Sequence, residues 1–529
     1  MPKVTIDGVE IEVAPGTTIL QAALTQGREI PHYCYHPGLS IAGNCRMCLV
    51  EVEKQPKLVI ACYTPVADGM VVYTNNAKVQ QAREAMMEFF LINHPLDCPI
   101  CDQAGECRLQ EYAVEYGSGK SRYTEPRLAL SKAVDIGPHV MLDQERCIQC
   151  SRCIRFCQEV TGTSELTFFQ RGERAQIAIH PGRRLDNPYS GNVVDICPVG
   201  ALTLKEFRFQ SRVWYLTNTA SVCAGCSRGC NVVVGTSAHD HYQLGEIRRL
   251  VPRVNMDVNQ WWMCDEGRLS FRTIQQAERA AKAEAPAGAA VEYEDAVAKA
   301  GALLRQAAAA GRAAAVVSPR STSETLFAWR ETFAGAGDVT VGVQRLRRGA
   351  DDALLIRADK GANSTGAAWV FGEHATVDRV LDAVKQGKVD VLVVVGDPLD
   401  PADSFDLPAD LAGAVRDVVY VGALVGGAAR RASVVLPAAA WGEEDGSMAN
   451  DQGRVQWLRR AHLPRCEARP GWRVAADVAE AGGHVLGPWG STSEVLASLA
   501  GSVPEYSGLD VDAIGMLGVL GKVRAAAGA

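Results

Sequence analysis

Cysteine is distributed very unevenly along this chain of 529 residues. Sixteen of its seventeen cysteines lie between Met1 and Cys264, and the second half holds only Cys466. The N-terminus begins with a strand-like pattern and lacks the basic and apolar segments of a secretion signal, so we expect no export. Reducing compartments keep thiols free. The cysteines are therefore expected to bind metal or iron–sulfur clusters and not to form disulfides.

The length and charge limit the other possibilities. A chain of this size exceeds what one hydrophobic core fills, so several domains are expected. The net charge of -7 and the absence of a long basic run give no reason to expect nucleic acid or an anionic lipid surface. Apolar runs such as residues 391–395 are much shorter than the roughly 20 residues of a membrane-spanning helix. Membrane association would therefore require partner proteins.

Near the N-terminus, the pattern predicts a small β-grasp domain. Residues 3–13 read as a hairpin because Asp7-Gly8 favours a tight turn between alternating apolar residues. Thr17 or Thr18 can cap a helix that runs to about Gly27. Further on, apolar residues recur at helical spacing over residues 78–92.

Beyond Phe271 the composition changes. An alanine-rich stretch over residues 277–310 predicts a linker followed by a helix. Apolar strands at 313–317, 389–395 and 418–421 then alternate with helix-like segments, which indicates an α/β domain with a largely parallel sheet. We interpret Gly396-Asp397-Pro398 as a turn at a strand end and not as a nucleotide site.

The spacing of the first ligand set is only moderately specific, and the Cys3His composition of the second set also suits zinc. Cys34, Cys45, Cys48 and Cys62 have the spacing C-x10-C-x2-C-x13-C, and four thiolates suit a 2Fe–2S cluster. His94, Cys98, Cys101 and Cys107 suit a 4Fe–4S cluster with one imidazole ligand, whose neutral charge should raise the reduction potential. Structural zinc remains an alternative for either set.

The third set is the most specific. Cys147, Cys150, Cys153 and Cys157 form the C-x2-C-x2-C-x3-C run of bacterial ferredoxins, in which the fourth cysteine serves another cluster. Only Cys197-Pro198 offers a further partner, so we assign one 4Fe–4S cluster to Cys147, Cys150, Cys153 and Cys197. Cys157 is then interpreted as a buried packing thiol.

A fourth set follows with the spacing C-x2-C-x3-C-x33-C. It consists of Cys223, Cys226, Cys230 and Cys264. Zinc is possible here too, but three cluster sets upstream favour another 4Fe–4S cluster.

With these sets in this order, the first 270 residues resemble the large iron–sulfur subunit of NADH:quinone oxidoreductase, respiratory complex I. The stretches that carry the resemblance are residues 32–37 (HYCYHP), 93–102 (NHPLDCPICD) and 191–202 (GNVVDICPVGAL). The resemblance implies one 2Fe–2S and three 4Fe–4S clusters. It also implies a multidomain α+β and α/β chain with five parts: a 2Fe–2S ferredoxin-type β-grasp domain (1–78), a helical His/Cys3 4Fe–4S domain (79–118), a 4Fe–4S bacterial-ferredoxin-like domain (138–212), a fourth 4Fe–4S domain of the molybdopterin-oxidoreductase type (213–271) and a truncated α/β domain (272–529).

The last part resembles molybdopterin oxidoreductases at residues 433–437 (SVVLP) and 444–455, with Asn450 and residues 453–456 (GRVQ). Two departures argue against a pterin. No cysteine is present between Cys264 and Cys466 to ligate a metal. Glu266 stands where active relatives commonly have a lysine beside the cluster. We therefore expect a scaffold domain without molybdopterin.

The resemblance implies a function as an electron-conducting subunit. Electrons would enter from a flavin subunit that oxidises NADH, cross the first three clusters and leave toward quinone through other peripheral-arm subunits, while the whole complex translocates protons. The location would be peripheral, on the cytoplasmic side of a bacterial inner membrane, with the membrane arm contacted indirectly. No G-x-G-x-x-G motif follows a strand, so we expect no NADH site and no catalytic residue in this chain. The alternatives are the catalytic subunit of an NAD-linked formate dehydrogenase, an electron-transfer subunit of an NAD-reducing hydrogenase, and a metal scaffold without electron transfer.

Overall fold

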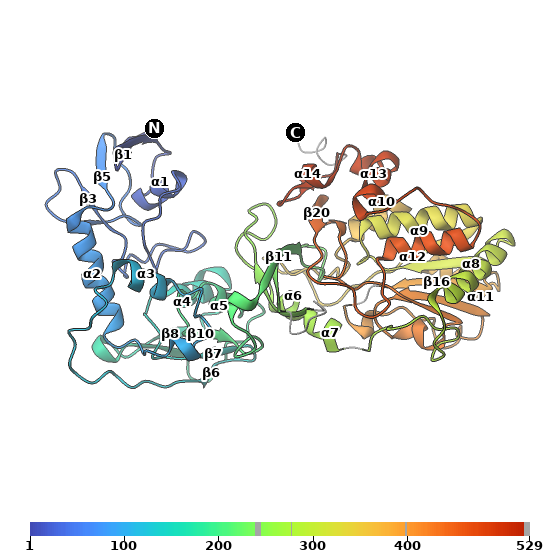
Figure 1. Ribbon diagram of the computed structural model, residues 1–529, viewed down its shortest axis with the longest axis horizontal. Coiled ribbons are helices and arrows are strands. Elements are labelled where there is room, and N and C mark those ends of the chain that lie inside the picture. Colours follow the sequence, from blue (N-terminus) through green and yellow to red (C-terminus); the bar gives the residue numbers. More distant parts are fainter. Residues whose placement is uncertain (238–244, 277, 397–398, 523–529) are drawn as a thin grey trace. The chain divides into compact units, whose positions relative to one another are not determined.

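The chain forms two compact units, Met1–Tyr215 and Leu216–Ala529, which we describe separately (Figure 1). The structure is a computed structural model that describes residues 1–237, 245–276, 278–396 and 399–522. Within these ranges, no helix combines the length and the apolar character needed to cross a membrane.

The first unit begins with a five-stranded mixed sheet. Its strand order is β2-β1-β5-β3-β4, with β1 and β5 parallel and the other pairs antiparallel. The strands are β1 (Lys3–Ile6), β2 (Val9–Glu12), β3 (Leu49–Val52), β4 (Val59–Ile60) and β5 (Met70–Tyr73). Helix α1 (Ile19–Thr25) packs its apolar face on this sheet. The predicted hairpin is confirmed, with positive φ at both turn residues Asp7 and Gly8.

Local sequence explains where α1 begins. The Thr18 hydroxyl accepts from the Gln21 amide, and the Gln21 side chain accepts from the Thr18 amide, which completes a capping box. The predicted helical segment near residues 78–92 is α2 (Ala77–Leu91), capped by the Asn76 side chain.

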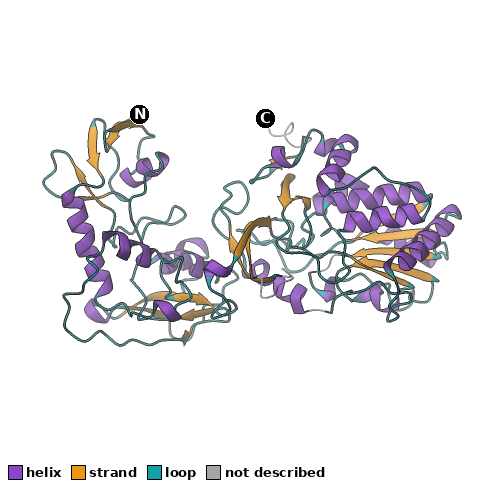
Figure 2. Cartoon of the chain, in the orientation of Figure 1, coloured by secondary structure: helices purple, strands orange, loops and turns teal. Residues whose placement is uncertain are grey.

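The rest of the first unit is made of short elements that hold long loops (Figure 2). Its helices are α3 (Arg108–Tyr116), α4 (Arg152–Arg155), a π-helix η2 (Phe156–Val160) and α5 (Asn192–Asp195). A three-stranded antiparallel sheet has the order β10-β7-β6, and β8 pairs with β9. These strands are β6 (Val134–Asp135), β7 (Val140–Leu142), β8 (Leu166–Phe169), β9 (Gln176–Ile179) and β10 (Leu202–Leu204).

The second unit opens with an antiparallel sheet and then forms a parallel one. The antiparallel strands are β11 (Thr217–Val222), β12 (Asn231–Ser237) and β13 (Glu246–Pro252). The parallel sheet has the order β15-β14-β16-β17-β18. Its strands are β14 (Ala313–Val317), β15 (Val339–Val343), β16 (Val391–Gly396), β17 (Asp417–Gly422) and β18 (Val434–Pro437). The predicted parallel α/β domain is confirmed.

Helices cover both faces of the parallel sheet. Alternate residues of β14 and β16 pack against α8, α9, α12 and α13 on one face and against α11 on the other. Burial on both faces explains why these strands read as continuous apolar runs. The helices of this unit are α6 (Asp265–Leu269), α7 (Phe271–Gln276), α8 (Tyr293–Ala309), α9 (Ser323–Ala336), α10 (Ser364–Phe371), α11 (Val377–Lys385), α12 (Gly471–Ala481), α13 (Thr492–Ser502) and α14 (Val511–Ile514).

A small antiparallel sheet completes the second unit. It has the order β19-β20-β21 and consists of β19 (Gly446–Ala449), β20 (Arg454–Leu458) and β21 (Val519–Leu520). Two expectations need adjustment: β16 begins at Val391, and the alanine-rich stretch is helical only within α8. The turn expected at Gly396-Asp397-Pro398 lies outside the described residues, except for its glycine.

Candidate iron–sulfur sites

The first ligand set is brought together by two loops. Cys34, Cys45 and Cys48 lie between α1 and β3, and Cys62 lies two residues after β4. All four thiols are buried. Hydrogen bonds from Cys45 and Cys62 lower the pKa of the Cys34 thiol, and a hydrogen bond from Cys62 lowers the pKa of Cys48. The four predicted ligands are therefore immediate neighbours.

Backbone amides also approach these sulfurs. The Tyr33 N–H lies 3.5 Å from Cys45 Sγ, and the amides of Asn44 and Cys45 contribute to lowering the pKa of Cys34. Gly43, at a φ of +61°, allows the loop to turn here. Amide dipoles aimed at sulfur favour the thiolate form that ligates iron.

In the second set, the three thiols lie near one another. Burial, together with smaller contributions from Cys101 and Cys98, raises the pKa of Cys107 to about 11, so these three thiols are near one another. Cys98 is exposed, whereas Cys101 and Cys107 are buried. Burial lowers the pKa of His94 to about 4, which keeps the imidazole in the neutral form that binds metals. Among the described residues, no hydrogen bond joins His94 to the three sulfurs.

The third set surrounds one cavity. Its wall contains all four predicted ligands, together with Arg152 and apolar side chains of β7 and β9; the four are Cys147, Cys150, Cys153 and Cys197. Cys157 does not line this cavity. It is fully buried in η2, where burial and the neighbouring Glu165 raise its pKa. This placement agrees with the interpretation of Cys157 as a packing thiol, which stays a prediction.

The first three sets meet in one buried apolar cluster. It contains members of all three sets and large side chains from the helices and loops between them: Tyr33, Cys34, Cys45, Met47, Met87, Cys107, Leu109, Tyr112, Cys150, Val199 and Ala201. Gly200 marks one close approach, because a Cβ there would lie 2.2 Å from Cys101 Sγ. These residues are far apart in the sequence, so it is the fold that brings the sets together.

Two arginines join the first set to the third. The Arg155 guanidinium donates to Cys34 O at 2.6 Å and to Cys150 O at 3.4 Å. Arg152 donates to Tyr35 O and, at 3.1 Å, to Ile196 O, next to Cys197. Both arginines come from the ferredoxin-like run, and sequence analysis did not single them out. In the sequence, their only signal was their position among the cysteines of this run.

The fourth set, in the second unit, also surrounds a cavity. Cys223, Cys226, Cys230 and Cys264 line it together with Glu266 and Lys360. The N–H of Gly267 lies 3.3 Å from Cys264 Sγ, and a Cβ on that glycine would lie 3.0 Å from Cys223 Sγ. Glycine therefore lets α6 approach two of the sulfurs without crowding them.

Comparisons with known proteins agree with this order of sites. Residues 2–77 match the family described as a 2Fe-2S iron-sulfur cluster binding domain, residues 83–122 match the NADH-ubiquinone oxidoreductase-G iron-sulfur binding region, residues 137–203 match the NADH-quinone oxidoreductase subunit 3 ferredoxin-like domain, and residues 232–481 match molybdopterin oxidoreductase. Relatives from Rickettsia bellii (strain RML369-C) and Rickettsia conorii (strain ATCC VR-613 / Malish 7) are each named as the G subunit of NADH-quinone oxidoreductase. They are 47% and 46% identical to this chain over 271 residues. The predicted resemblance to this family is confirmed.

The extent of the similarity is limited. The matched region is 51% of this chain and 39% of each relative. A crystal structure of an NAD+-reducing NiFe hydrogenase in the H2-reduced state is also similar, at 30% identity and a TM-score of 0.37, over 40% of this chain and 91% of that one.

The part that resembles molybdopterin oxidoreductases supports the fourth set directly. Asn450 donates to Arg228 O at 3.3 Å, and Gln456 donates to Gly229 O at 2.9 Å. Both acceptors lie in the loop between Cys226 and Cys230. Two residues that carried the sequence resemblance therefore fix the shape of the cysteine loop, a role that sequence analysis missed.

The third and fourth donor sets have an arrangement that suits iron–sulfur clusters. In the described part of the chain, no group of three or more His, Cys, Asp or Glu side chains has the geometry of a metal-ion site. The cysteines of the third and fourth sets instead stand around cavities, which is the arrangement that a cluster of several irons and sulfides needs.

Proposed function

We propose that this chain is the electron-conducting iron–sulfur subunit of an NADH:quinone oxidoreductase, a proton-translocating enzyme, and that it has no active site of its own. It would carry one cluster in each of the four predicted N-terminal domains: a 2Fe–2S cluster on the first set and 4Fe–4S clusters on the other three. When bound, these clusters supply one-electron transfer between the flavin subunit and the subunits nearer quinone.

The observation that carries this proposal is the convergence of the first three ligand sets. They belong to different segments, yet they share one buried apolar cluster within the first unit. Proteins that merely store metal have no need to bring chemically different sites together. An electron-transfer chain does, and burial also tunes the reduction potentials.

The surrounding residues have defined tasks in this proposal. Arg155 and Arg152 hold the loops of the first and third sets against each other through carbonyl oxygens. Their positive charges partly offset the negative charge of the thiolate sets in a medium of low dielectric constant. Amides such as that of Tyr33 donate to sulfur and stabilise the thiolate form.

For the C-terminal domain we propose a scaffold without molybdopterin. The sequence between Cys264 and Cys466 offers no thiolate for a molybdenum or tungsten ion. The domain uses Asn450 and Gln456 to shape the fourth cysteine loop. Support of the fourth cluster is therefore a sufficient role for it.

Metal analysis and purification test the proposal together. The isolated protein should contain about fourteen irons, as much acid-labile sulfide, and neither molybdenum nor tungsten. Reduction should bleach its visible absorbance and produce several paramagnetic signals. The native protein should co-purify with an NADH-oxidising flavoprotein and membrane subunits. Bound molybdenum with formate-dependent NAD reduction would refute the proposal in favour of a formate dehydrogenase, and co-purification with a hydrogenase would refute it in favour of a hydrogenase subunit.

A further inference from the structure

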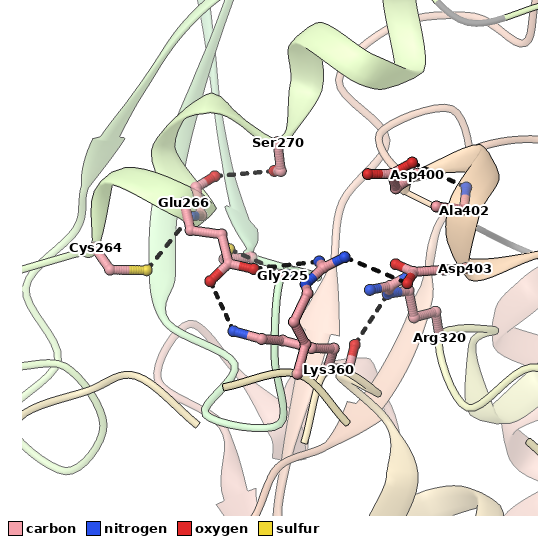
Figure 3. Close-up of polar contacts among 12 residues, drawn as sticks. Gly225, Cys264, Glu266, Ser270, Arg320, Lys360, Asp400, Ala402 and Asp403 are labelled. Atoms are coloured by element: carbon pink, nitrogen blue, oxygen red, sulfur yellow. Dashed lines mark hydrogen bonds and ion pairs between the residues drawn. The ribbon is translucent and has the colours of Figure 1, made fainter. Parts of the chain in front are cut away.

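A buried lysine faces the cavity of the fourth ligand set. Lys360 lines that cavity together with all four cysteines, and its side chain is only 4% exposed. Its Nζ lies 2.7 Å from Glu266 Oε2, and Figure 3 shows the two side chains pointing toward each other. Glu266 also lines the cavity, but its side chain is 44% exposed. Two opposite charges therefore stand at the wall of the proposed cluster site.

Several contacts fix Lys360 in this place. Its N–H donates to Leu346 O at 2.6 Å, and its carbonyl accepts from Arg320 Nε at 2.9 Å. Arg320 is itself buried and paired with Asp403 at 2.8 Å. The preceding residue binds the cysteine loop, because Ser227 N donates to Asp359 O at 2.9 Å. The ammonium group is thus held by the same loop that supports the cysteines.

Glu266 lies between this cavity and a second one. It also pairs with the exposed Arg348, whose Nη2 lies 3.3 Å from Glu266 Oε1. Glu266 and Gly225 line both the cysteine cavity and the second cavity, which also contains Arg320. Glu266 therefore forms part of the partition between them, with solvent on one side and the cysteines on the other.

The two charges should act on a cluster in opposite directions. Reduction adds a negative charge, so a nearby ammonium favours the reduced state and a nearby carboxylate disfavours it. Screening is weak for a side chain as buried as Lys360. Glu266 is more exposed and is also paired with Arg348, so its effect is more strongly screened than that of Lys360.

Building on the proposed function, we propose that the charges of Lys360 and Glu266 set the reduction potential of the fourth cluster. Lys360 raises this potential and Glu266 lowers it.

The test is a potentiometric titration of the full chain followed by electron paramagnetic resonance. Lys360→Met should lower the midpoint potential of the fourth cluster, and Glu266→Gln should raise it. The double variant should lie between the two single variants, because it removes both charges. Lys299→Met deletes the same charge from an exposed position on α8 in the same unit, and it should leave the potential unchanged.

Opposite shifts distinguish an electrostatic role from a structural one. If both single variants shift the potential in the same direction, or neither shifts it while the cluster is retained, the inference is wrong. Loss of the cluster in both variants would likewise overturn it, because the residues would then be needed for assembly. If the unaltered protein shows no fourth cluster although the first three are present, the fourth-site assignment itself fails and the inference fails with it.

Discussion

Glu324 should make the second unit less stable as the pH rises through neutrality. This residue lies in the first turn of α9 and is fully buried. Its Oε2 accepts from Ser447 N–H at 2.7 Å, while Oε1 has no hydrogen-bond partner among the described residues. Burial raises the pKa of this carboxyl from 4.5 to about 7. The folded protein therefore holds a proton that the unfolded chain loses at lower pH.

The size and sign of the effect follow from proton linkage. Stability contributed by the protonated form is complete below the unfolded pKa of 4.5 and is lost as the pH rises through about 7. The full loss is about 3 kcal/mol, of which about 2 kcal/mol falls between pH 5.5 and 8.5. Glu324→Gln keeps the shape of the side chain but cannot ionise, so this part of the pH dependence should disappear.

The measurement is urea unfolding of both proteins at several pH values, followed by tryptophan fluorescence. Trp329, Trp441 and Trp472 are buried in the second unit and report on it. Glu331→Gln, on the same helix but half-exposed, is the matched control and should keep the original pH dependence. If Glu324→Gln shows the same slope against pH as the unaltered protein, the reasoning from burial is refuted.

Three further substitutions test the ligand assignments. Cys157→Ala should leave the iron content unchanged and cost about 1 kcal/mol of stability, since it removes one buried sulfur; loss of four irons would make Cys157 a ligand. His94→Cys should retain the second cluster but lower its midpoint potential, because a thiolate adds a negative charge; an unchanged potential would contradict ligation by His94. Gly267→Ala should reduce the occupancy of the fourth cluster, as measured by iron analysis, because its Cβ would lie 3.0 Å from Cys223 Sγ, whereas Gly501→Ala meets nothing within 4 Å and should have no effect.

Short-range patterns predicted the local structure well. The turn at Asp7-Gly8, the cap at Thr18 and the apolar run of β16 depend on neighbouring residues, and the structure contains all three. Cysteine spacing likewise predicted which thiols gather around the third and fourth cavities.

Long-range partners could not be predicted in this way. Lys360 reaches Glu266 across 94 positions, and Gln456 reaches Gly229 across 227. No periodicity records such pairs, and a lone lysine is normally expected in solvent. Arg155 was not predicted for the same reason, because most of its partners are backbone carbonyls, which residue type does not record.

The contact between Gln456 and the fourth cysteine loop has a consequence for biosynthesis. A ribosome delivers the chain from its N-terminus, and domains generally fold as they emerge. The first three ligand sets are complete once Cys197 has emerged, so iron and sulfide can be inserted there while translation continues. The fourth loop lacks the contacts with Asp359 and Gln456 until most of the polypeptide has been made. Maturation of this protein should therefore occur in two stages, with the fourth site loaded last and most often missing when synthesis outpaces the iron supply.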